Sequence, residues 1–141
     1  MDRSAADSYL SASTRGILIT NRKDGRSQSS NIAYTYRDGV VRISLTTSRA
    51  KTKNLLRDPR ALLHVTSSDE WYQYVVADGS VEITPPATDT TDATADELCE
   101  VFEAITGQAH PDWEEFRQAM VDEGRVVARL TVEHVYGQLN G

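Results

Sequence analysis

Short runs rich in apolar residues, separated by turn residues, dominate the chain and predict strands. Apolar and polar side chains alternate most clearly in residues 40–45. The predicted strands are residues 15–20, 28–36, 40–45, 61–66, 71–83 and 125–135. Asp24-Gly25 and Asp38-Gly39 lie between successive strands, and Asp-Gly pairs are typical of tight hairpin turns. The pattern therefore predicts antiparallel strands, with a bulge at Gly79 where the 71–83 strand is interrupted.

Helical spacing of apolar residues is found in the second half of the chain. The first of these helices is predicted to begin at a capping box, residues 94–97, and to end at Gly107. The second begins at Asp112 and ends at Gly124. Residues 84–92, rich in proline and threonine, predict an exposed irregular linker. Residues 4–14 predict a short N-terminal helix.

These elements predict a mainly β protein in which a helical pair is inserted among antiparallel strands. About six strands with two or three helices favour a small closed or half-open β-barrel, formed by residues 1–141 as a single domain. No stretch approaches the ~20 apolar residues that a membrane span requires. The first seven residues also lack the apolar core of a secretory signal, so we expect a cytoplasmic protein with no membrane partner.

Charge is distributed unevenly along the chain. Residues 1–60 contain twelve of the fifteen Lys and Arg residues and only five acidic residues, whereas residues 61–116 contain thirteen acidic residues and no Lys or Arg. The formal net charge is −6. Because neutralisation of phosphates supplies most of the affinity for nucleic acids, this balance argues against nucleic-acid binding. A small anionic ligand held in a local positive pocket fits better.

The basic residues concentrate in residues 47–60, directly after the 40–45 strand. Five Lys or Arg residues fall between Arg49 and Arg60. Ser48 is the expected N-cap of a helix that continues to Arg57 and is stopped by Asp58-Pro59. A helix N-terminus attracts anions through its free N–H groups and its dipole, so the basic side chains beside it predict a phosphate socket. The alternative is a solvated surface helix.

Other motifs exclude several chemistries. The three histidines do not form a catalytic triad with a serine elbow, and they lack the spacing of metal ligands. His64 lies within an apolar strand and is expected to be a structural histidine of the barrel. Cys99 is expected to be a buried structural thiol. No glycine-rich nucleotide motif is present. We therefore predict no metal site, and the motifs identify no catalytic side chain.

Two clusters remain as candidates for ligand contact. Residues 71–74 are Trp, Tyr, Gln and Tyr, and strand alternation would place Tyr72 and Tyr74 on one face of the sheet. They are either core aromatics or a wall for a flat ring system. Residues 28–31 offer hydroxyl and amide groups at the start of a strand. These could contact the polar edge of a heterocycle or simply continue the preceding turn.

Residues 25–31 and 48–60 together resemble the flavin-binding split-barrel family, which includes the pyridoxamine 5′-phosphate oxidases. The run from Arg49 to Arg60 is similar to the branch of deazaflavin-dependent oxidoreductases that use coenzyme F420. The likeness covers nearly the whole chain. Further matching segments are residues 77–79, 83–86, 112–113, 116–121 and 134–137.

This resemblance implies a split β-barrel that acts as a homodimer, with cofactor sites at the subunit interface. It implies hydride transfer between F420 and a small unsaturated or quinone-like substrate. Residues matching the segment around the cofactor phosphate and tail are Arg49, Ala50, Lys51, Thr52 and Asn54. Residues matching the segment beside the ring are Gln28, Ser29, Ser30 and Asn31, and those matching aromatics from the partner subunit are Tyr72 and Tyr74.

Two alternatives stay open. One is an FMN-binding flavoprotein similar to the pyridoxamine 5′-phosphate oxidases. The chain ends without the arginine- and tryptophan-bearing segment with which those oxidases bind substrate, which argues against oxidation of pyridoxamine phosphate. The other alternative is a carrier or sensor that binds F420 without turning it over.

Overall fold

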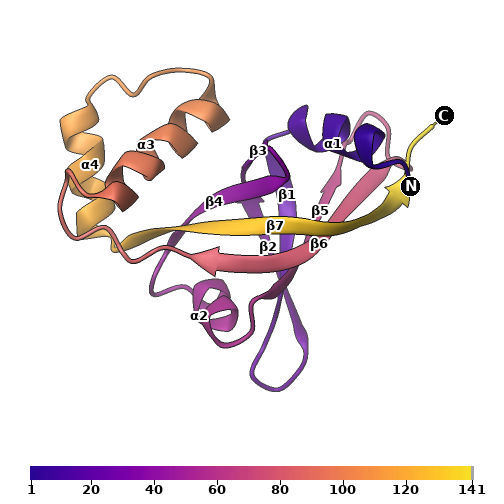
Figure 1. The fold of residues 1–141 in the computed structure, drawn as a ribbon, viewed down its shortest axis with the longest axis horizontal. Helices are drawn as coiled ribbons and strands as arrows, with labels where there is room; N and C mark the ends of the chain where they lie inside the picture. The colour runs from indigo at the N-terminus through magenta and orange to yellow at the C-terminus, as the bar shows by residue number, and fades with distance from the viewer. Residues whose placement is uncertain (141) are drawn as a thin grey trace.

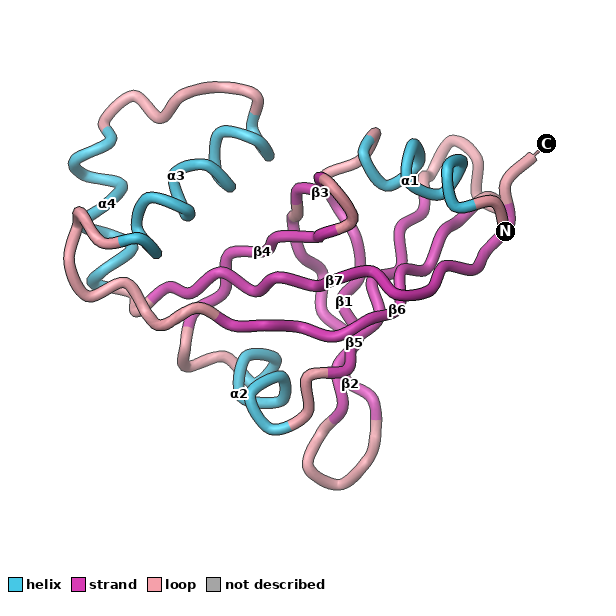
Figure 2. Tube along the Cα trace, viewed as in Figure 1, coloured by secondary structure: helices cyan, strands magenta, loops and turns pink. Residues whose placement is uncertain are grey.

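The computed structural model describes residues 1–140 and contains seven antiparallel strands in one curled sheet (Figures 1 and 2). The order across the sheet is β2-β1-β5-β6-β7-β4-β3. The strands are β1 (Arg15–Asn21), β2 (Ser27–Ala33), β3 (Thr35–Arg37), β4 (Val40–Thr46), β5 (Arg60–Thr66), β6 (Tyr74–Ile83) and β7 (Arg125–Gln138). The mainly β class and the half-barrel are confirmed.

The count of seven strands, against about six predicted, results from a break at Tyr34. This residue separates β2 from β3 and is fully buried, and its hydroxyl donates a hydrogen bond to the Leu10 carbonyl at 2.7 Å. The chain can therefore bend there without losing a buried polar partner. The predicted Asp-Gly turns are confirmed, since Gly25 and Gly39 have φ values of 86° and 78°.

Four helices accompany the sheet, more than the two or three predicted. They are α1 (Arg3–Ser11), α2 (Ala50–Arg57), α3 (Ala93–Thr106) and α4 (Trp113–Asp122). Figure 1 shows α3 and α4 together at one end of the sheet, α1 at the other end, and α2 below the middle. No helix within residues 1–140 is long and apolar enough to cross a membrane.

Two predicted helix starts were wrong. Thr47 and Ser48 form a turn after β4, and Arg49 has extended backbone angles, so Arg49 and not Ser48 is the N-cap of α2. For α3, the carboxylate of Asp92 accepts from the Ala95 N–H at 2.8 Å, whereas the hydroxyl of Thr94 donates to the Pro85 carbonyl. A carboxylate two residues earlier thus replaces the predicted capping box. The starts of α4 at Asp112 and the end of α3 at Gly107 are confirmed.

The linker at residues 84–92 is irregular as predicted, but it is not exposed throughout. Thr84 and Ala87 are buried, because their N–H groups donate to the carbonyls of Val127 and Arg125 and hold the linker against β7. The linker is therefore part of the packing beneath α3.

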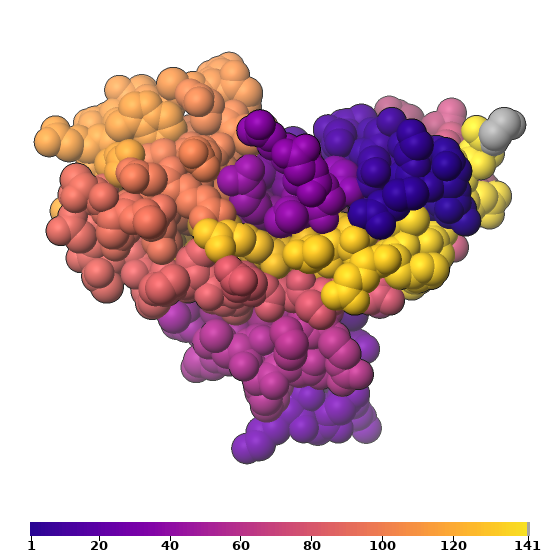
Figure 3. Space-filling model, in the orientation of Figure 1, coloured from indigo at the N-terminus to yellow at the C-terminus, as the bar shows by residue number. Residues whose placement is uncertain are grey.

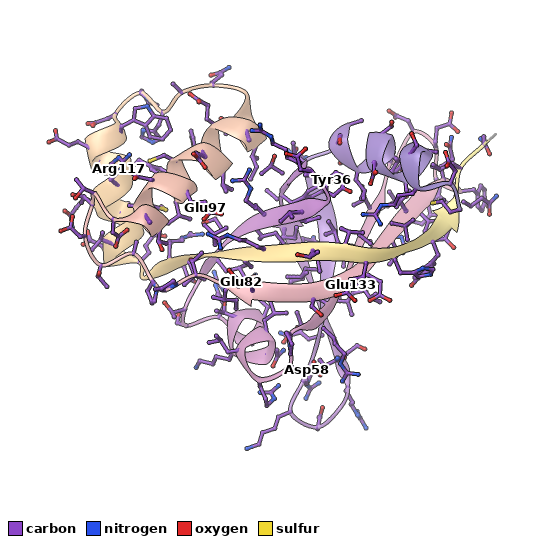
Figure 4. All side chains as sticks on the ribbon, in the orientation of Figure 1. Tyr36, Asp58, Glu82, Glu97, Arg117 and Glu133 are labelled. Carbon is purple, nitrogen blue, oxygen red and sulfur yellow. The ribbon has the colours of Figure 1, made fainter. Side chains whose placement is uncertain are left out.

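The main core lies inside the curled sheet, and α1 closes one end of it with Ala6 and Leu10. A second, smaller cluster lies between the sheet and the helical pair. Its buried members are Ala87, Ala95, Leu98, Val101, Met120 and Val127. In the space-filling view, α3 and α4 form a lobe distinct from the body of the strands (Figure 3). The ion pair of Arg129 with Glu97, whose position is labelled in Figure 4, fastens α3 to β7.

The bulge predicted at Gly79 of β6 lies instead in the facing strand: the register shifts between Asp78 and Gly79, and the extra residue is Glu133 of β7. A Cβ atom on Gly79 would lie only 1.8 Å from the Thr131 carbonyl oxygen. The close approach of the two backbones therefore requires glycine at this position.

The outer face of the sheet, opposite the main core, carries apolar side chains. The strand registers place Ile17, His64, Val76 and Tyr136 in one row across β1, β5, β6 and β7. Ile19 and Leu62 form a neighbouring pair on the same face. We call these six residues the outer-face patch.

Candidate functional site

The first turn of α2 presents the basic residues of the predicted phosphate socket. No side chain among residues 1–140 caps this turn. Arg49 is exposed and Lys51 half-buried. Burial lowers the pKa of the Lys51 ammonium, and the nearby Arg49 and Arg125 lower it further. Three cations therefore lie close together beside free N–H groups, an arrangement that favours an anion.

The basic residues of the socket differ from Arg60, in the same 49–60 segment, in whether they form ion pairs. Arg60 pairs with Asp58, labelled in Figure 4, at 2.8 Å. By contrast, no carboxylate within residues 1–140 forms an ion pair with Arg49, Lys51 or Lys53. The charges at the start of α2 are thus not neutralised by the protein itself.

Asn54 joins α2 to the predicted ring-binding strand. Its Nδ2 donates to the Gln28 Oε1 at 2.7 Å and to the Thr20 Oγ1 at 3.2 Å, and its Oδ1 accepts from Arg57 at 2.9 Å. Asn54 is 6% exposed, so these bonds are shielded from water. Two segments separated by 26 residues are therefore held together by one amide.

Thr52 has a structural task beside this socket. It is fully buried, and its hydroxyl donates to the Thr46 carbonyl at 2.7 Å. That bond ties the helix to the end of β4 and fixes the direction in which the first turn points. Ala50 is exposed in the same turn, so its backbone is accessible to a ligand.

The four polar residues of β2 divide between the two faces of the sheet. Gln28 and Ser30 share the inner face with Ile32, whereas Ser29 and Asn31 are exposed on the outer face. Asn31 lines an open cavity of about 410 Å³ together with Ile17, His64 and Thr66. The complete lining is Arg15, Gly16, Ile17, Asn31, Ile32, Ala33, His64 and Thr66.

The aromatic segment differs from its prediction. Trp71 and Tyr72 lie in a turn before β6, and their exposed fractions are 68% and 81%. The predicted alternation of Tyr72 with Tyr74 on one strand is therefore wrong, since only Tyr74 is in the strand. The turn forms because the Gln73 N–H bonds to the Glu70 carbonyl. Tyr74 stacks on His64, with ring centroids 5.1 Å apart.

Within one chain, the two tyrosines do not join the basic socket. α2 approaches β6 near the far end of that strand, where the Val81 N–H donates to the Pro59 carbonyl. Tyr74 begins the strand at the opposite end, roughly 20 Å away at ~3.3 Å per residue (Figure 1). The structure thus joins Gln28 to Asn54, but it does not bring Tyr72 or Tyr74 to the socket.

The position of Arg125 near the socket was not predicted, and neither was the face of the sheet on which His64 lies. Arg125 reaches the socket through the pairing of Thr46 with Arg125 in the β4–β7 ladder, a contact between distant segments that no local pattern reveals. His64 belongs to the outer face, not to the barrel interior. The alternation of side chains along its strand could have predicted this face.

Cys99 is half-buried on α3, and burial raises the pKa of its thiol. The thiol form therefore dominates at neutral pH, consistent with a structural role. Among residues 1–140, no group of three or more His, Cys, Asp or Glu side chains is placed to hold a metal ion.

Together, the half-barrel and its polar seam between β2 and α2 define a protein of the split-barrel class. The family model of pyridoxamine 5′-phosphate oxidase matches residues 3–139. The chain belongs to this family.

Solved structures support the same assignment. An F420 reductase is 25% identical, with a TM-score of 0.72, and the match covers 94% of this chain and 96% of that one. A conserved hypothetical protein from Mycobacterium tuberculosis is 20% identical, with a TM-score of 0.74 and coverages of 100% and 93%. A FAD-binding protein from Mesorhizobium loti is 22% identical, with a TM-score of 0.68 and coverages of 96% and 90%. Heme-binding proteins share the fold as well.

Proposed function

We propose that the protein is an F420-dependent oxidoreductase that transfers a hydride between F420 and a small unsaturated or quinone-like substrate. One observation carries the proposal. An uncapped helix start with unpaired Arg49 and Lys51 is held by Asn54 against Gln28. F420 combines a flat ring with a long anionic tail, which matches a polar strand beside a basic socket. The 25% identity to an F420 reductase over nearly the full length supports the same assignment.

The residues present fit the group that they would hold. The N–H groups of the first turn of α2, with Arg49 and Lys51, would bind the phosphate and the acidic tail. Residues 28–31 would orient the ring beside β2. When bound, the deazaflavin supplies the hydride chemistry itself. The side chains then need only bind, orient and exclude water, which agrees with the lack of a predicted catalytic nucleophile.

We further propose that the active unit is a homodimer formed through the outer-face patch. Contiguous apolar side chains on a sheet face mark an interaction surface. Tyr72 and Tyr74 lie at the end of β6 remote from α2, so they could contact a cofactor only in another subunit. A dimer would supply them to the partner's socket.

Titration by calorimetry tests the cofactor assignment. We expect micromolar binding of F420 and much weaker binding of FMN. Lys51→Ala should weaken F420 binding by about 1.5–3 kcal/mol, the contribution of a charge-assisted hydrogen bond. Arg37→Ala, which removes one positive charge from the exposed β3–β4 hairpin, is the matched control and should bind as the unchanged protein does.

Equal F420 affinities of the Lys51→Ala and Arg37→Ala variants would show that the socket does not bind the cofactor. Tighter binding of FMN than of F420 would indicate that FMN is the cofactor. Reoxidation of the reduced cofactor by added acceptors, followed by absorbance, separates an enzyme from a carrier or sensor. Binding without any turnover across quinones and unsaturated ketones would favour the carrier.

A further inference from the structure

A second cavity, of about 280 Å³, lies between the helical pair and the sheet. Its walls are largely apolar and come from α3, α4 and the strands β2, β4 and β7. The lining residues are Ala33, Ser44, Leu98, Val101, Phe102, Ile105, Thr106, Phe116, Met120 and Arg125. The cavity lies outside the segments assigned to the cofactor. Its volume is about twice the ~150 Å³ of an apolar cavity that accepts benzene, so it has room for two fused rings.

Aromatic packing keeps one wall of this cavity in place. Phe102 of α3 and Phe116 of α4 have ring centroids 5.1 Å apart. Trp113 supports both, with centroids 5.9 Å from Phe102 and 5.5 Å from Phe116. Edge-to-face and tilted contacts of this kind favour flat aromatic partners. The wall is therefore suited to a planar ring.

The polar groups of the cavity indicate which ring compounds it accepts. The Nη1 atom of Arg125 donates to the Ser44 Oγ at 3.3 Å, and both residues line the space. The other side of the same guanidinium is bound to the Glu123 carboxylate at 2.9 and 3.2 Å. Glu123 thus neutralises Arg125. An uncharged hydrogen-bond acceptor matches this pair of donors better than a carboxylate, which would also face Glu123.

We propose that this cavity binds a neutral bicyclic ring compound with one carbonyl group, whose oxygen accepts hydrogen bonds from Ser44 and Arg125. The site does not depend on the proposed function, because none of its contacts involves the cofactor. A compound of about eleven heavy atoms in such a pocket should have a dissociation constant on the order of 100 μM.

The two methionines make a direct test available. Met120 is 8% exposed in the cavity wall, whereas Met1 is 48% exposed at the N-terminus. With ¹³C-labelled methionine methyl groups in the full chain and no F420 present, 1-tetralone should shift the Met120 signal saturably and leave Met1 unchanged. Tetralin, which lacks only the carbonyl, should bind roughly three- to tenfold more weakly. 1-Naphthoate should also bind more weakly.

Three variants sharpen the result. Ile105→Trp fills the cavity and should abolish the Met120 shift, while Ala104→Trp, at the neighbouring exposed position, should preserve it. Ser44→Ala should lower the affinity for tetralone, because only Arg125 then donates to the carbonyl, and leave tetralin binding unchanged. A Met120 signal unmoved up to the solubility limit overturns the site, as does undiminished binding to Ile105→Trp. Tighter binding of naphthoate overturns the assigned ligand class.

Discussion

At the scale of single residues, Asn54 connects the parts of the candidate site. It is buried on α2 and satisfies Gln28, Thr20 and Arg57 with one amide group. Removing it would leave the Gln28 side chain without this donor in a shielded position. An unsatisfied buried group costs more than the net value of the bond itself. Asn54 thus belongs to the segment expected to bind the cofactor and also links α2 to β2.

We predict that Asn54→Ala lowers the free energy of unfolding by about 1–3 kcal/mol. Urea unfolding followed by circular dichroism measures the change. Lys53→Ala, at the exposed position next to it, should stay within about 0.5 kcal/mol of the unchanged protein. The link would be refuted by unfolding midpoints that coincide for the two variants.

At the scale of elements, helix starts and strand bends depend on particular side chains. Asp92 caps α3, and its pKa is lowered by hydrogen bonds first from the Thr88 N–H and then from the Ala95 N–H. Gly79 permits the bend of β6 against β7. Both residues fix how the linker and α3 leave the sheet.

The Asp92 cap predicts a dependence of stability on pH. Because the folded pKa is depressed, its contribution is fully present above the unfolded value of about 3.9 and is lost as pH falls through the lower folded value. We expect Asp92→Ala to cost about 1 kcal/mol at pH 7. The difference from the unchanged protein should shrink in unfolding experiments below pH 3. A difference that is constant with pH would argue against the charged cap.

We predict that Gly79→Ala destabilises the protein by about 3 kcal/mol or more, because its Cβ would overlap the Thr131 carbonyl. Thermal unfolding checks this. Gly107→Ala, at an exposed position with positive φ but open space around the Cβ, should cost roughly 1 kcal/mol. Equal losses for the two variants would mean that the bulge adjusts to a side chain.

Local patterns predicted most elements, because alternation and Asp-Gly turns are short-range signals. The strand predicted for Trp71 to Gln73 was wrong. Aromatic residues have high strand propensity, but the Glu70–Gln73 hydrogen bond makes this segment a turn. The N-cap prediction at Ser48 was wrong because Ser48 lies in the turn closed by the Arg49 N–H and the Thr46 carbonyl, so the helix begins one residue later. The Asn54–Gln28 contact and the approach of Arg125 depend on tertiary pairing, which no single stretch of sequence contains.

At the scale of the whole molecule, the outer-face patch and the remote tyrosines lead to the same expectation. The row from Ile17 to Tyr136 crosses four strands on the side of the sheet opposite the core. A second copy of the chain would shield it and complete the socket. The proposed dimer therefore links assembly to cofactor affinity.

We predict that Ile17→Lys produces a folded monomer with weaker F420 binding, since a charge in an apolar interface is left unpaired. Sedimentation velocity measures the assembly, and calorimetry measures the affinity. Leu56→Lys, on an exposed helix position of 62% accessibility, is the control and should remain dimeric. A monomeric unchanged protein, or a variant that stays dimeric, would contradict the proposed interface.

The register shift in β7 has a consequence for how the chain tolerates changes in length. Before it, even-numbered residues such as Leu130 and Val132 point inward, and after it the inward residue is Val135. Glu133 is the extra residue of β7, without a pairing partner in the β6–β7 ladder. Loss of Glu133 would therefore remove the bulge and leave the facings on both sides unchanged, whereas loss of a paired residue such as Thr131 would turn one half of the strand inside out and expose its apolar side chains. Added residues in the 84–92 connection would also leave every facing unchanged, so viable changes in length should accumulate there and at Glu133 and be purged from the paired positions of β7.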